Sequence, residues 1–341
     1  MTRLVQIIAG QAHGGAEAFF ERLGIALHRA GETQRLVIRR DAARAARLRQ
    51  AGCEVVEISF GGKLDLRTRP ALSAAIAEFA PQVVLTWMNR ASSACPAGDF
   101  VRVGRLGGYY DLKYYRGCDH LVANTRDIAD YIVRGGWPAE RVHYLPNFAA
   151  RETVAKLPRA SLSTPEDAPL ALALGRLHRN KGFDVLLEAA ALVPALHLWL
   201  AGEGEEREAL ERRAQALGIA SRVRFLGWRD DVAALLASSD MLVSSSRHEP
   251  LGNVLLEAWA AGVPVAAAAS EGPRELIRDG ETGLLVPAED AAALAAAMAR
   301  LAGDGALRAR LAEAGRERWE REFSERPIVA LYRDFLAGLT R

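Results

Sequence analysis

Short apolar runs alternate with Ala- and Leu-rich stretches along most of the chain. Apolar runs of this length, bounded by glycine or polar residues, are typical of buried strands, and the longer stretches are typical of helices. Strands are predicted at residues 4–9, 35–38, 54–59, 83–87, 120–123, 170–174, 196–201, 223–226, 241–243 and 263–268. Because helical stretches separate the strands, the pattern predicts an α/β fold with parallel sheets.

The chain is long enough for two domains, since 341 residues exceed the usual size of one hydrophobic core. A polar stretch with two prolines predicts a linker at residues 149–168, between domains at residues 1–148 and 169–318, and residues 319–341 are predicted as a final helix. No apolar run reaches the roughly 18 residues needed to span a bilayer. The N-terminus lacks a convincing cleavage site and is interpreted as a first buried strand.

Cysteine content and charge limit the compartment and the partners. Three scattered cysteines, Cys53, Cys95 and Cys118, indicate a reducing compartment such as the cytoplasm and no metal cluster. The net charge of +2 is uneven, with +6 on residues 1–148 and −4 on residues 149–341. A basic first half suits an acidic partner, such as a phosphorylated or lipid-linked substrate. An Arg-rich coding bias would produce the same asymmetry.

The stretch RHEPLGNVLLEAWAAGVPV, residues 247–265, carries the clearest chemistry in the chain. An apolar strand leads through three serines into a loop with Glu249 and Gly252, and a helix begins at about Asn253. Free N–H groups and partial positive charge at a helix start attract anions, and a glycine lets a phosphate approach the backbone closely. We therefore predict an anion site at this turn.

Glu249 and Glu257 bracket the turn with seven residues between them. Three other glutamate pairs of the chain have the same spacing, so the informative part is the carboxylate, proline and glycine at a strand-to-helix turn. This combination resembles the E-x7-E element of the retaining GT-B glycosyltransferases of family 4. The resemblance implies two Rossmann-like domains facing each other across a cleft, with the C-terminal helix returning to the first domain. It also implies transfer of a sugar, with retention, from a nucleotide diphosphate sugar such as a UDP-sugar.

Other segments resemble further elements of the same family. They are the GGAE loop at residues 14–17, the G-R-L…K-G element at residues 175–182, the AGEG turn at residues 201–204 and the closing segment at residues 272–287. The resemblance covers nearly the whole chain and is strongest at residues 170–290.

The resemblance places the donor site in the second domain. Arg176 and Lys181 would neutralise the departing diphosphate without a metal, and Glu249 would bind sugar hydroxyls or stabilise an oxocarbenium-like centre. These three are the predicted catalytic residues. Donor binding is predicted for Gly14, Gly15, Gly175, Glu203, Trp228, Leu251, Gly252, Asn253 and Glu257. Within this set, the backbone N–H groups around Gly252 would bind the phosphates of the nucleotide sugar, and Glu257 would accept hydrogen bonds from its ribose hydroxyls.

The first domain is predicted to bind the acceptor. Tyr and Arg side chains can stack on sugars and clamp phosphates. The predicted acceptor ligands are Asn89 and Arg90, where many relatives have a histidine, and Arg105, Tyr109 and Tyr110 from the Arg- and Tyr-rich segment 101–125. A loop whose tyrosines pack on the domain face would have the same composition. By resemblance, the acceptor is a saccharide or a lipid-linked saccharide of lipopolysaccharide. The protein would act in the cytoplasm or on the cytoplasmic face of the inner membrane, where an anionic surface would be a partner.

Two other functions remain open. One is a different GT-B enzyme, such as a nucleotide-sugar epimerase or a phosphorylase, although no motif for a pyridoxal phosphate lysine is visible. The other is a non-catalytic nucleotide-sugar-binding scaffold, which would be expected to have lost the cations or carboxylates that this chain retains. No cofactor, metal or nucleic acid is predicted. The chain has neither G-x-x-x-x-G-K-[ST] nor G-x-G-x-x-G at its first strand, and Asp230 and Asp231 are adjacent and more typical of a helix start than of a DxD motif.

Overall fold

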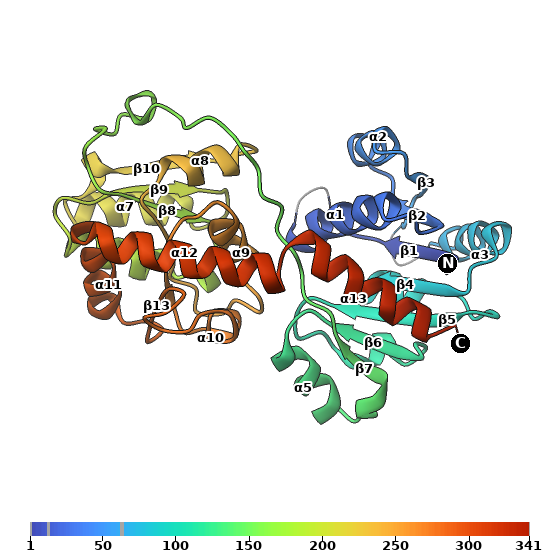
Figure 1. Cartoon of the computed structure of the whole chain (residues 1–341). Coiled ribbons are helices and arrows are strands. Elements are labelled where there is room, and N and C mark those ends of the chain that lie inside the picture. The colour runs from blue at the N-terminus through green and yellow to red at the C-terminus, as the bar shows by residue number, and fades with distance from the viewer. Residues whose placement is uncertain (1, 12–13, 62–64, 341) are drawn as a thin grey trace. The chain divides into compact units, whose positions relative to one another are not determined.

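The computed structural model describes residues 2–11, 14–61 and 65–340. The chain forms two compact units, one of Met1–Phe148 with Glu325–Arg341 and the other of Ala149–Ser324. Each unit is built on one sheet flanked by helices (Figure 1), and every strand pair in both sheets is parallel, as the alternating pattern predicts.

The first unit has a seven-stranded sheet in the order β3-β2-β1-β4-β5-β6-β7. The strands are β1 Leu4–Ile8, β2 Gln34–Arg39, β3 Glu54–Ile58, β4 Val83–Trp87, β5 Val101–Leu106, β6 His120–Ala123 and β7 Val142–Tyr144. The helices are α1 Gly15–Arg29, α2 Ala42–Gln50, α3 Thr68–Phe79, α4 Met88–Ala94 and α5 Arg126–Arg134, with 3-10 turns η1 Leu112–Tyr115 and η2 Ala139–Arg141. Strands β1 and β4 are buried along their whole length, which explains why they are apolar except for one buried polar residue each, Gln6 and Thr86.

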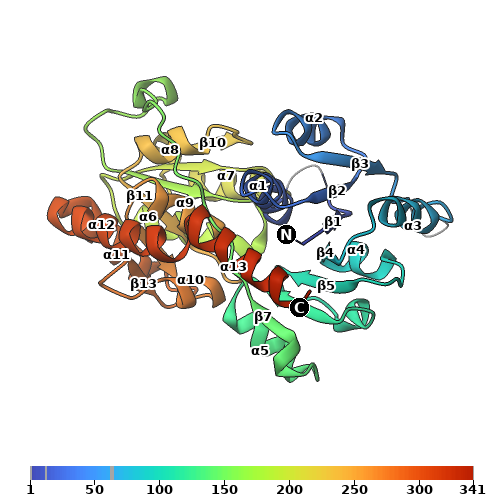
Figure 2. The same cartoon turned by 45° about the vertical axis from the view of Figure 1, so that its right-hand side comes forward.

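The last helix, α13 Glu325–Gly338, packs on the first unit, which confirms the predicted return of the C-terminal helix. Tyr332 of α13 lies in the same apolar cluster as Phe19 of α1, and Figure 2 shows the two helices close together. The helix begins later than residue 319 because Trp319 and Phe323 belong to the core of the second unit.

The second unit has a six-stranded sheet in the order β10-β9-β8-β11-β12-β13. The strands are β8 Leu170–Leu174, β9 His197–Ala201, β10 Val223–Gly227, β11 Met241–Ser244, β12 Val265–Ala268 and β13 Leu284–Val286. The helices are α6 Phe183–Ala191, α7 Arg207–Ala216, α8 Val232–Ser238, α9 Asn253–Ala260, α10 Glu271–Leu276, α11 Ala291–Gly303 and α12 Gly305–Glu322, with 3-10 turns η3 Arg159–Leu162, η4 Arg179–Lys181 and η5 Ala220–Arg222.

Three strands were not predicted from the sequence. Strands β7 and β13 have three residues each, too few to show a period. Strand β5 has two arginines and a glycine among its six residues, a composition that favours a binding segment, yet it lies inside the sheet with Val103 and Leu106 fully buried. No helix within the described ranges is long and apolar enough to cross a membrane.

Both sheets reverse their strand order once, between β1 and β4 in the first unit and between β8 and β11 in the second. In open parallel sheets, ligands bind outside the carboxyl ends of the strands at such a reversal. These two positions are therefore where site residues are expected.

Candidate active site

In the second unit, the loops after β8 and β11 hold the residues predicted to be catalytic. The chain leaves β8 through Gly175 and Arg176, and it leaves β11 through a loop that ends at Gly252, the N-cap of α9. Because β8 and β11 are parallel neighbours, both loops start from the same edge of the sheet. Two motifs that are far apart in the sequence thus begin at one place.

Lys181 and Glu249 meet directly at this edge. The Lys181 ammonium at the end of η4 forms an ion pair with the Glu249 carboxylate, and the Ser246 hydroxyl lies 3.4 Å from the same carboxylate oxygen. A side chain at Gly175 would crowd the Lys181 stem, since its Cβ would lie 3.0 Å from Lys181 Cε. Glycine at this position lets the lysine lie across the end of β8. The structure therefore brings together three predicted residues: Gly175, Lys181 and Glu249.

Arg176, the other predicted cation, points elsewhere. Its side chain is 71% exposed and pairs with Glu205 at 3.1 Å, while His178 lies 3.5 Å from the same carboxylate. Exposed pairs of this kind contribute little to stability, typically about 0–1 kcal/mol. Arg176 can therefore exchange Glu205 for another anion at small cost.

Helix α9 presents the predicted phosphate-binding turn. Gly252 has a φ of 86°, a left-handed conformation that favours glycine, and no side chain caps the helix start. The first-turn N–H groups therefore have no side-chain acceptor at the N-cap. Leu251 is buried, whereas Asn253 and Glu257 are partly exposed and lie one turn apart on one face of the helix.

The remaining predicted donor residues of the second unit lie after β9 and β10. Gly202 and Gly227 form an antiparallel bridge, so the turn with Glu203 lies beside the turn with Trp228. Glu203 pairs with Arg207 at 2.9 Å. Trp228 is 55% exposed and donates a hydrogen bond from its indole N–H to Asp230 at 2.9 Å. An exposed indole of this kind offers a flat surface on which a nucleotide base can stack.

Arg247 anchors the start of the loop before α9, a role that the sequence did not indicate. Its guanidinium forms a two-bond pair with Asp184 of α6, both at 2.8 Å, and also reaches Glu289 at 2.8 Å. The hydrogen bonds to Asp184 and Glu289 raise the pKa of Arg247, and the hydrogen bonds from Arg247 lower the pKa of Asp184. The loop is thereby tied to α6 just ahead of Glu249.

His248 and Glu271 are also part of the site, and sequence reasoning missed both. The Glu271 carboxylate accepts from His248 Nδ1 at 2.9 Å and from the backbone N–H of Glu249 at 3.1 Å. Burial opposes ionisation of Glu271, but hydrogen bonds from backbone N–H groups and from His248 outweigh it and lower the pKa of this carboxyl. The one available signal was the position of Glu271 directly before the GPRELI segment.

In the first unit, the glycine loop follows β1 as predicted. Gly14 is the N-cap of α1, and Gly15 is the first residue of that helix. Glu17 is 7% exposed beneath the loop and accepts from the Gln11 backbone N–H at 2.9 Å. A side chain at Gly14 would collide with the Glu17 carboxylate, so glycine at this position leaves room for the acid.

Asn89 and Arg90 follow β4, across the strand reversal from the glycine loop. Arg90 donates to the backbone carbonyls of Phe60 and Gly61. Asn89 Oδ1 is buried without a hydrogen-bond partner, and Met88 has a left-handed φ of 62°. Strained backbone and unsatisfied polar atoms are uncommon and occur most often at functional sites.

Arg105 lies inside the first unit, with only 2% of its surface exposed. Its guanidinium donates to the Tyr332 hydroxyl at 3.0 Å and to Asn147, and it lies over the rings of Phe19 and Trp87. Since strand β5 directs this side chain into the core, we do not propose Arg105 as an acceptor ligand.

Tyr109 and Tyr110 pack beside α5. The Tyr109 ring lies edge-on to Tyr131, 5.4 Å between centroids, and its hydroxyl bonds to Asp127. Burial raises the pKa of the Tyr110 hydroxyl. This packing matches the alternative interpretation of the segment, in which the tyrosines pack on the domain face, and both rings still remain partly exposed.

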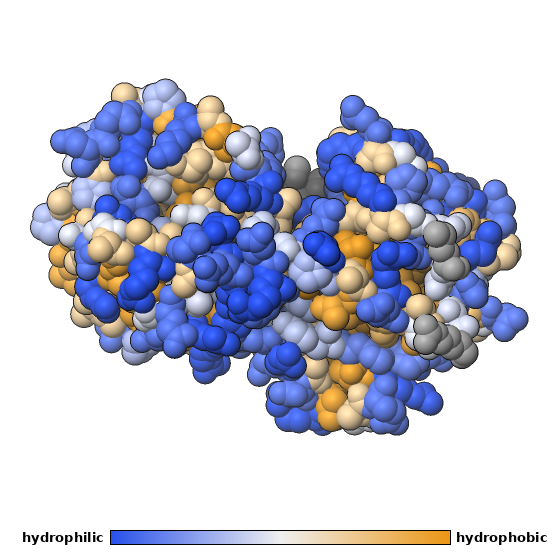
Figure 3. All heavy atoms as spheres, viewed as in Figure 1, coloured by the Kyte–Doolittle hydropathy of each residue, from blue (hydrophilic) through white to orange (hydrophobic). Residues whose placement is uncertain are grey.

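A basic and apolar surface lies next to these tyrosines. We call it the η1–α5 surface and define it by the exposed residues Lys113, Tyr114, Arg116, Val133 and Arg134. Two acids are exposed beside them: Asp111, which pairs with Lys113 at 2.6 Å, and Asp130 of α5. Leu112 of η1 packs against Gly135 at the end of α5, so the two segments are in contact. Figure 3 shows apolar and hydrophilic side chains mixed over the region where Figure 1 places α5 and β7.

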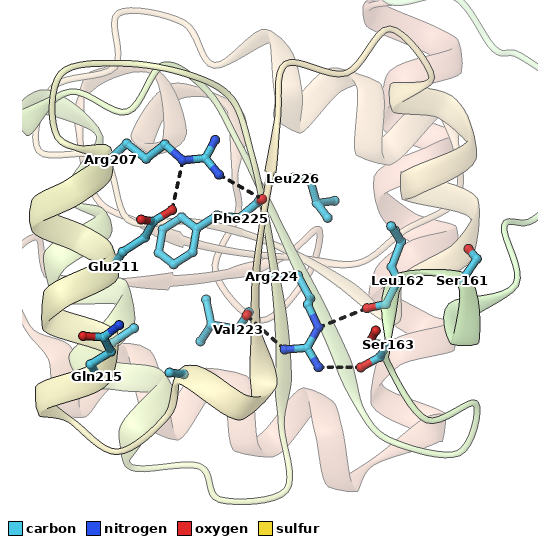
Figure 4. A pocket seen from close by; sticks show the side chains of 12 residues that line it. Ser161, Leu162, Ser163, Arg207, Glu211, Gln215, Val223, Arg224, Phe225 and Leu226 are labelled. Atoms are coloured by element: carbon cyan, nitrogen blue, oxygen red, sulfur yellow. Dashed lines mark hydrogen bonds and ion pairs between the residues drawn. The ribbon is translucent and has the colours of Figure 1, made fainter.

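A groove of about 500 Å³ lies beside β10, an edge strand of the second sheet. None of the predicted site residues lines it. Figure 4 shows that Arg224 closes one side by donating to the carbonyls of Leu162 and Ser163, at 3.1 and 2.6 Å. Its charged groups are therefore used within the fold, and the strand reversal remains the candidate active site. Among the side chains that the structure describes, no three His, Cys, Asp or Glu residues are placed to hold a metal ion.

Comparison with known sequences gives clear relatives. The family model for glycosyl transferases group 1 matches residues 156–318. The chain is 41% identical over 338 residues to the lipopolysaccharide core biosynthesis glycosyltransferase LpsE of Rhizobium meliloti, covering 95% of this chain and 96% of the relative. It is 37% identical over 329 residues to LpsD of the same organism, another lipopolysaccharide core biosynthesis glycosyltransferase, covering 94% of each.

Comparison with solved structures supports the fold. The crystal structure of Anabaena HepE in complex with UDP and glucose superposes with a TM-score of 0.84 at 20% identity, over 99% of this chain and 100% of that one. This similarity confirms the predicted GT-B-like fold.

Proposed function

The chain belongs to the glycosyl transferases group 1 family, and on that premise we propose that it is a retaining, metal-independent hexosyltransferase of lipopolysaccharide core synthesis. The family predicted from the E-x7-E turn is thereby confirmed. Two relatives that match almost end to end are lipopolysaccharide core biosynthesis glycosyltransferases, which supports the choice of pathway. The complex of HepE with UDP and glucose supports a UDP-sugar as the donor.

The observation that carries the proposal is the meeting of Lys181 and Glu249 at the strand reversal of the second sheet. A nucleotide diphosphate bound there would place its phosphates on the first-turn N–H groups of α9, near Gly252. Lys181 would then stabilise the negative charge that develops on the leaving diphosphate, and Arg176 would leave Glu205 to join it. Glu257, one turn into α9, would accept hydrogen bonds from the ribose hydroxyls.

Glu249 is proposed to act at the sugar. As the bond between the anomeric carbon and the diphosphate oxygen breaks, positive charge develops on the sugar ring. A carboxylate beside the ring stabilises that charge electrostatically. The acceptor hydroxyl attacks the anomeric carbon from the face that the diphosphate leaves, and its proton passes to the departing phosphate oxygen. This sequence retains the anomeric configuration and requires no protein nucleophile.

The first unit is proposed to bind the acceptor. The unpartnered Asn89 Oδ1 can accept a hydrogen bond from a sugar hydroxyl, and Tyr109 and Tyr110 offer partly exposed rings. The η1–α5 surface would hold a lipid-linked acceptor at an anionic membrane, on the cytoplasmic face of the inner membrane.

The proposal is tested in two stages. A saturation-transfer NMR screen of nucleotide sugars identifies the donor, and UDP-hexoses are expected to give signals that excess UDP abolishes. The donor is then incubated with lipopolysaccharide core oligosaccharides, and NMR of the product gives the anomeric configuration. Transfer with retention supports the proposal. Conversion of the nucleotide sugar without an acceptor would instead indicate an epimerase. Binding without turnover on any acceptor would indicate a non-catalytic scaffold.

A further inference from the structure

The backbone of Glu249 is held from both sides by the first two residues of α10. The Glu271 carboxylate accepts the Glu249 N–H at 3.1 Å, and the Gly272 N–H donates to the Glu249 carbonyl at 2.8 Å. Glu271 and Gly272 are adjacent, so one short segment binds both the backbone N–H and the backbone carbonyl of Glu249. Glu249 therefore has little freedom to shift along the loop.

Gly272 makes this close approach possible. A Cβ at Gly272 would collide with the backbone of Leu251, so any side chain here would push α10 away from the loop. The contact thus extends over Glu249 and Leu251, the residues directly before the phosphate-binding turn at Gly252. Together these contacts form what we call the α10 latch, made by Glu271 and Gly272.

Glu271 also orients His248. Because an ionised carboxylate can only accept, the proton in the 2.9 Å contact lies on His248 Nδ1. A histidine whose one nitrogen donates to a carboxylate has its ring orientation and tautomer fixed. The side chain of His248 is 42% exposed and that of Glu271 25%, so the histidine faces outward from a carboxylate that is mostly covered.

We propose that Glu271 is a positioning residue for sugar transfer, holding Glu249 and His248 in the geometry that the reacting sugar requires. This role rests on the proposed function, in which Glu249 acts at the sugar. Glu271 lies outside the E-x7-E element and does not itself contact the ion pair between Lys181 and Glu249. Its loss should therefore affect the rate of the transfer step more than the affinity for the nucleotide.

The decisive comparison is between two substitutions of the same residue. Glu271→Ala removes both hydrogen bonds, and it is expected to lower kcat by about 10–100-fold, the usual effect of losing an outer-shell partner, with the donor KM changed by less than about threefold. Glu271→Gln keeps an oxygen for the Glu249 N–H, and its N–H₂ keeps a contact with His248 Nδ1 by donating to it, which selects the other histidine tautomer. Because the hold on the Glu249 backbone and the ring orientation are kept, kcat is expected to return to within about threefold of the wild type. Glu281→Ala is the matched control, because Glu281 is exposed and lies outside the latch.

Hydrogen exchange provides a second readout that needs no activity. In Glu271→Ala, the backbone amides of His248, Glu249 and Leu251 should exchange faster than in the wild type, whereas Glu281→Ala should leave them unchanged. The proposal is overturned if Glu271→Ala turns over sugar at the wild-type rate, or if the loop amides exchange equally in both proteins. If the wild type itself transfers no sugar, the proposed function fails, and the exchange experiment alone decides whether the latch exists.

Discussion

Lys181 and Glu249 form an ion pair at the strand reversal of the second sheet, although 68 positions separate them in the sequence. Their side chains are 23% and 14% exposed, so water screens the pair less than it screens a surface pair. A nucleotide diphosphate bound at α9 would compete with Glu249 for the same ammonium group. The pair therefore marks the position where phosphate and sugar are proposed to meet.

Lys181→Ala tests the phosphate half of this site. Removing the cation should cost on the order of 2–4 kcal/mol of transition-state stabilisation, measured as the loss in kcat/KM. The fold should be retained, which the melting temperature and circular dichroism check. Lys156→Ala, at an exposed lysine of the same unit, serves as the control and should match the wild type. An unchanged kcat/KM in folded Lys181→Ala would show that the lysine does not bind the leaving group.

The proximity of Lys181 and Glu249 could be predicted because both residues belong to turns that follow parallel strands. Apolar runs identify the strands, helices between them make the sheet parallel, and parallel strands end at a common edge. The glycine loop and Asn89 were also expected after strands of the first domain, and the structure places them at the reversal of the first sheet. Periodicity predicts the strands and their turns, whereas the family resemblance selects which turn residues bind the substrates.

The contacts of Glu271 and the burial of Arg105 could not be predicted in this way. Glu271 reaches Glu249 because two loops from neighbouring strands approach closely, and that distance depends on packing rather than on any spacing in the sequence. Arg105 was predicted as an acceptor ligand, but it lies on an inner strand and its guanidinium faces aromatic rings in the core. A charged side chain in the core gives the same sequence pattern as a binding residue.

Gly252→Ala tests the turn at the start of α9. A left-handed φ of 86° costs an alanine about 1–2 kcal/mol, and the added methyl group would also hinder approach of a phosphate. We expect the dissociation constant for UDP, measured by calorimetry, to rise by about tenfold or more.

Gly262→Ala is the matched control for that experiment. Gly262 also has a left-handed φ, 69°, but no atom lies within 4 Å of where its Cβ would be. This variant should lose comparable stability and bind UDP as the wild type does. Equal effects of the two substitutions on UDP binding would assign the Gly252 effect to backbone strain alone.

Metal independence follows from the two cations proposed for the diphosphate. If Lys181 and Arg176 supply the positive charge that a divalent ion supplies elsewhere, turnover should persist in EDTA. The measurement is the initial rate before and after chelation. Loss of activity that Mn²⁺ or Mg²⁺ restores would contradict the prediction.

His120 and His143 should make the first unit sensitive to acid. The rings face each other on β6 and β7, with Nδ1 and Nε2 3.1 Å apart, and Phe335 of α13 covers His143. Burial lowers the pKa of both below 6.5; the Arg141 charge lowers that of His120 further, whereas Asp119 raises it. The unfolded chain therefore takes up protons first, so the stability is fully present above about pH 6.5 and is lost as the pH falls below that value through the lower folded-state pKa values of the two histidines.

The measurement is the melting temperature across this pH range. A variant with His120→Gln and His143→Gln should lose less stability on acidification than the wild type, because the two protonations that favour unfolding are removed. The same pH dependence in both proteins would show that other groups control the acid sensitivity.

Membrane attachment is the last prediction, and it rests on the η1–α5 surface. Lys113 and Arg116 are exposed there beside Tyr114, and each cation near an anionic surface contributes about 1 kcal/mol. Co-sedimentation with anionic vesicles should therefore weaken with salt, and Lys113→Glu with Arg116→Glu should weaken it at least about tenfold. Arg151→Glu with Lys156→Glu makes the same charge change at exposed positions of the second unit and should have a much smaller effect. If the protein co-sediments with neither anionic nor neutral vesicles at low salt, and if it turns over a soluble uncharged acceptor, the result would favour an enzyme that works on free saccharides.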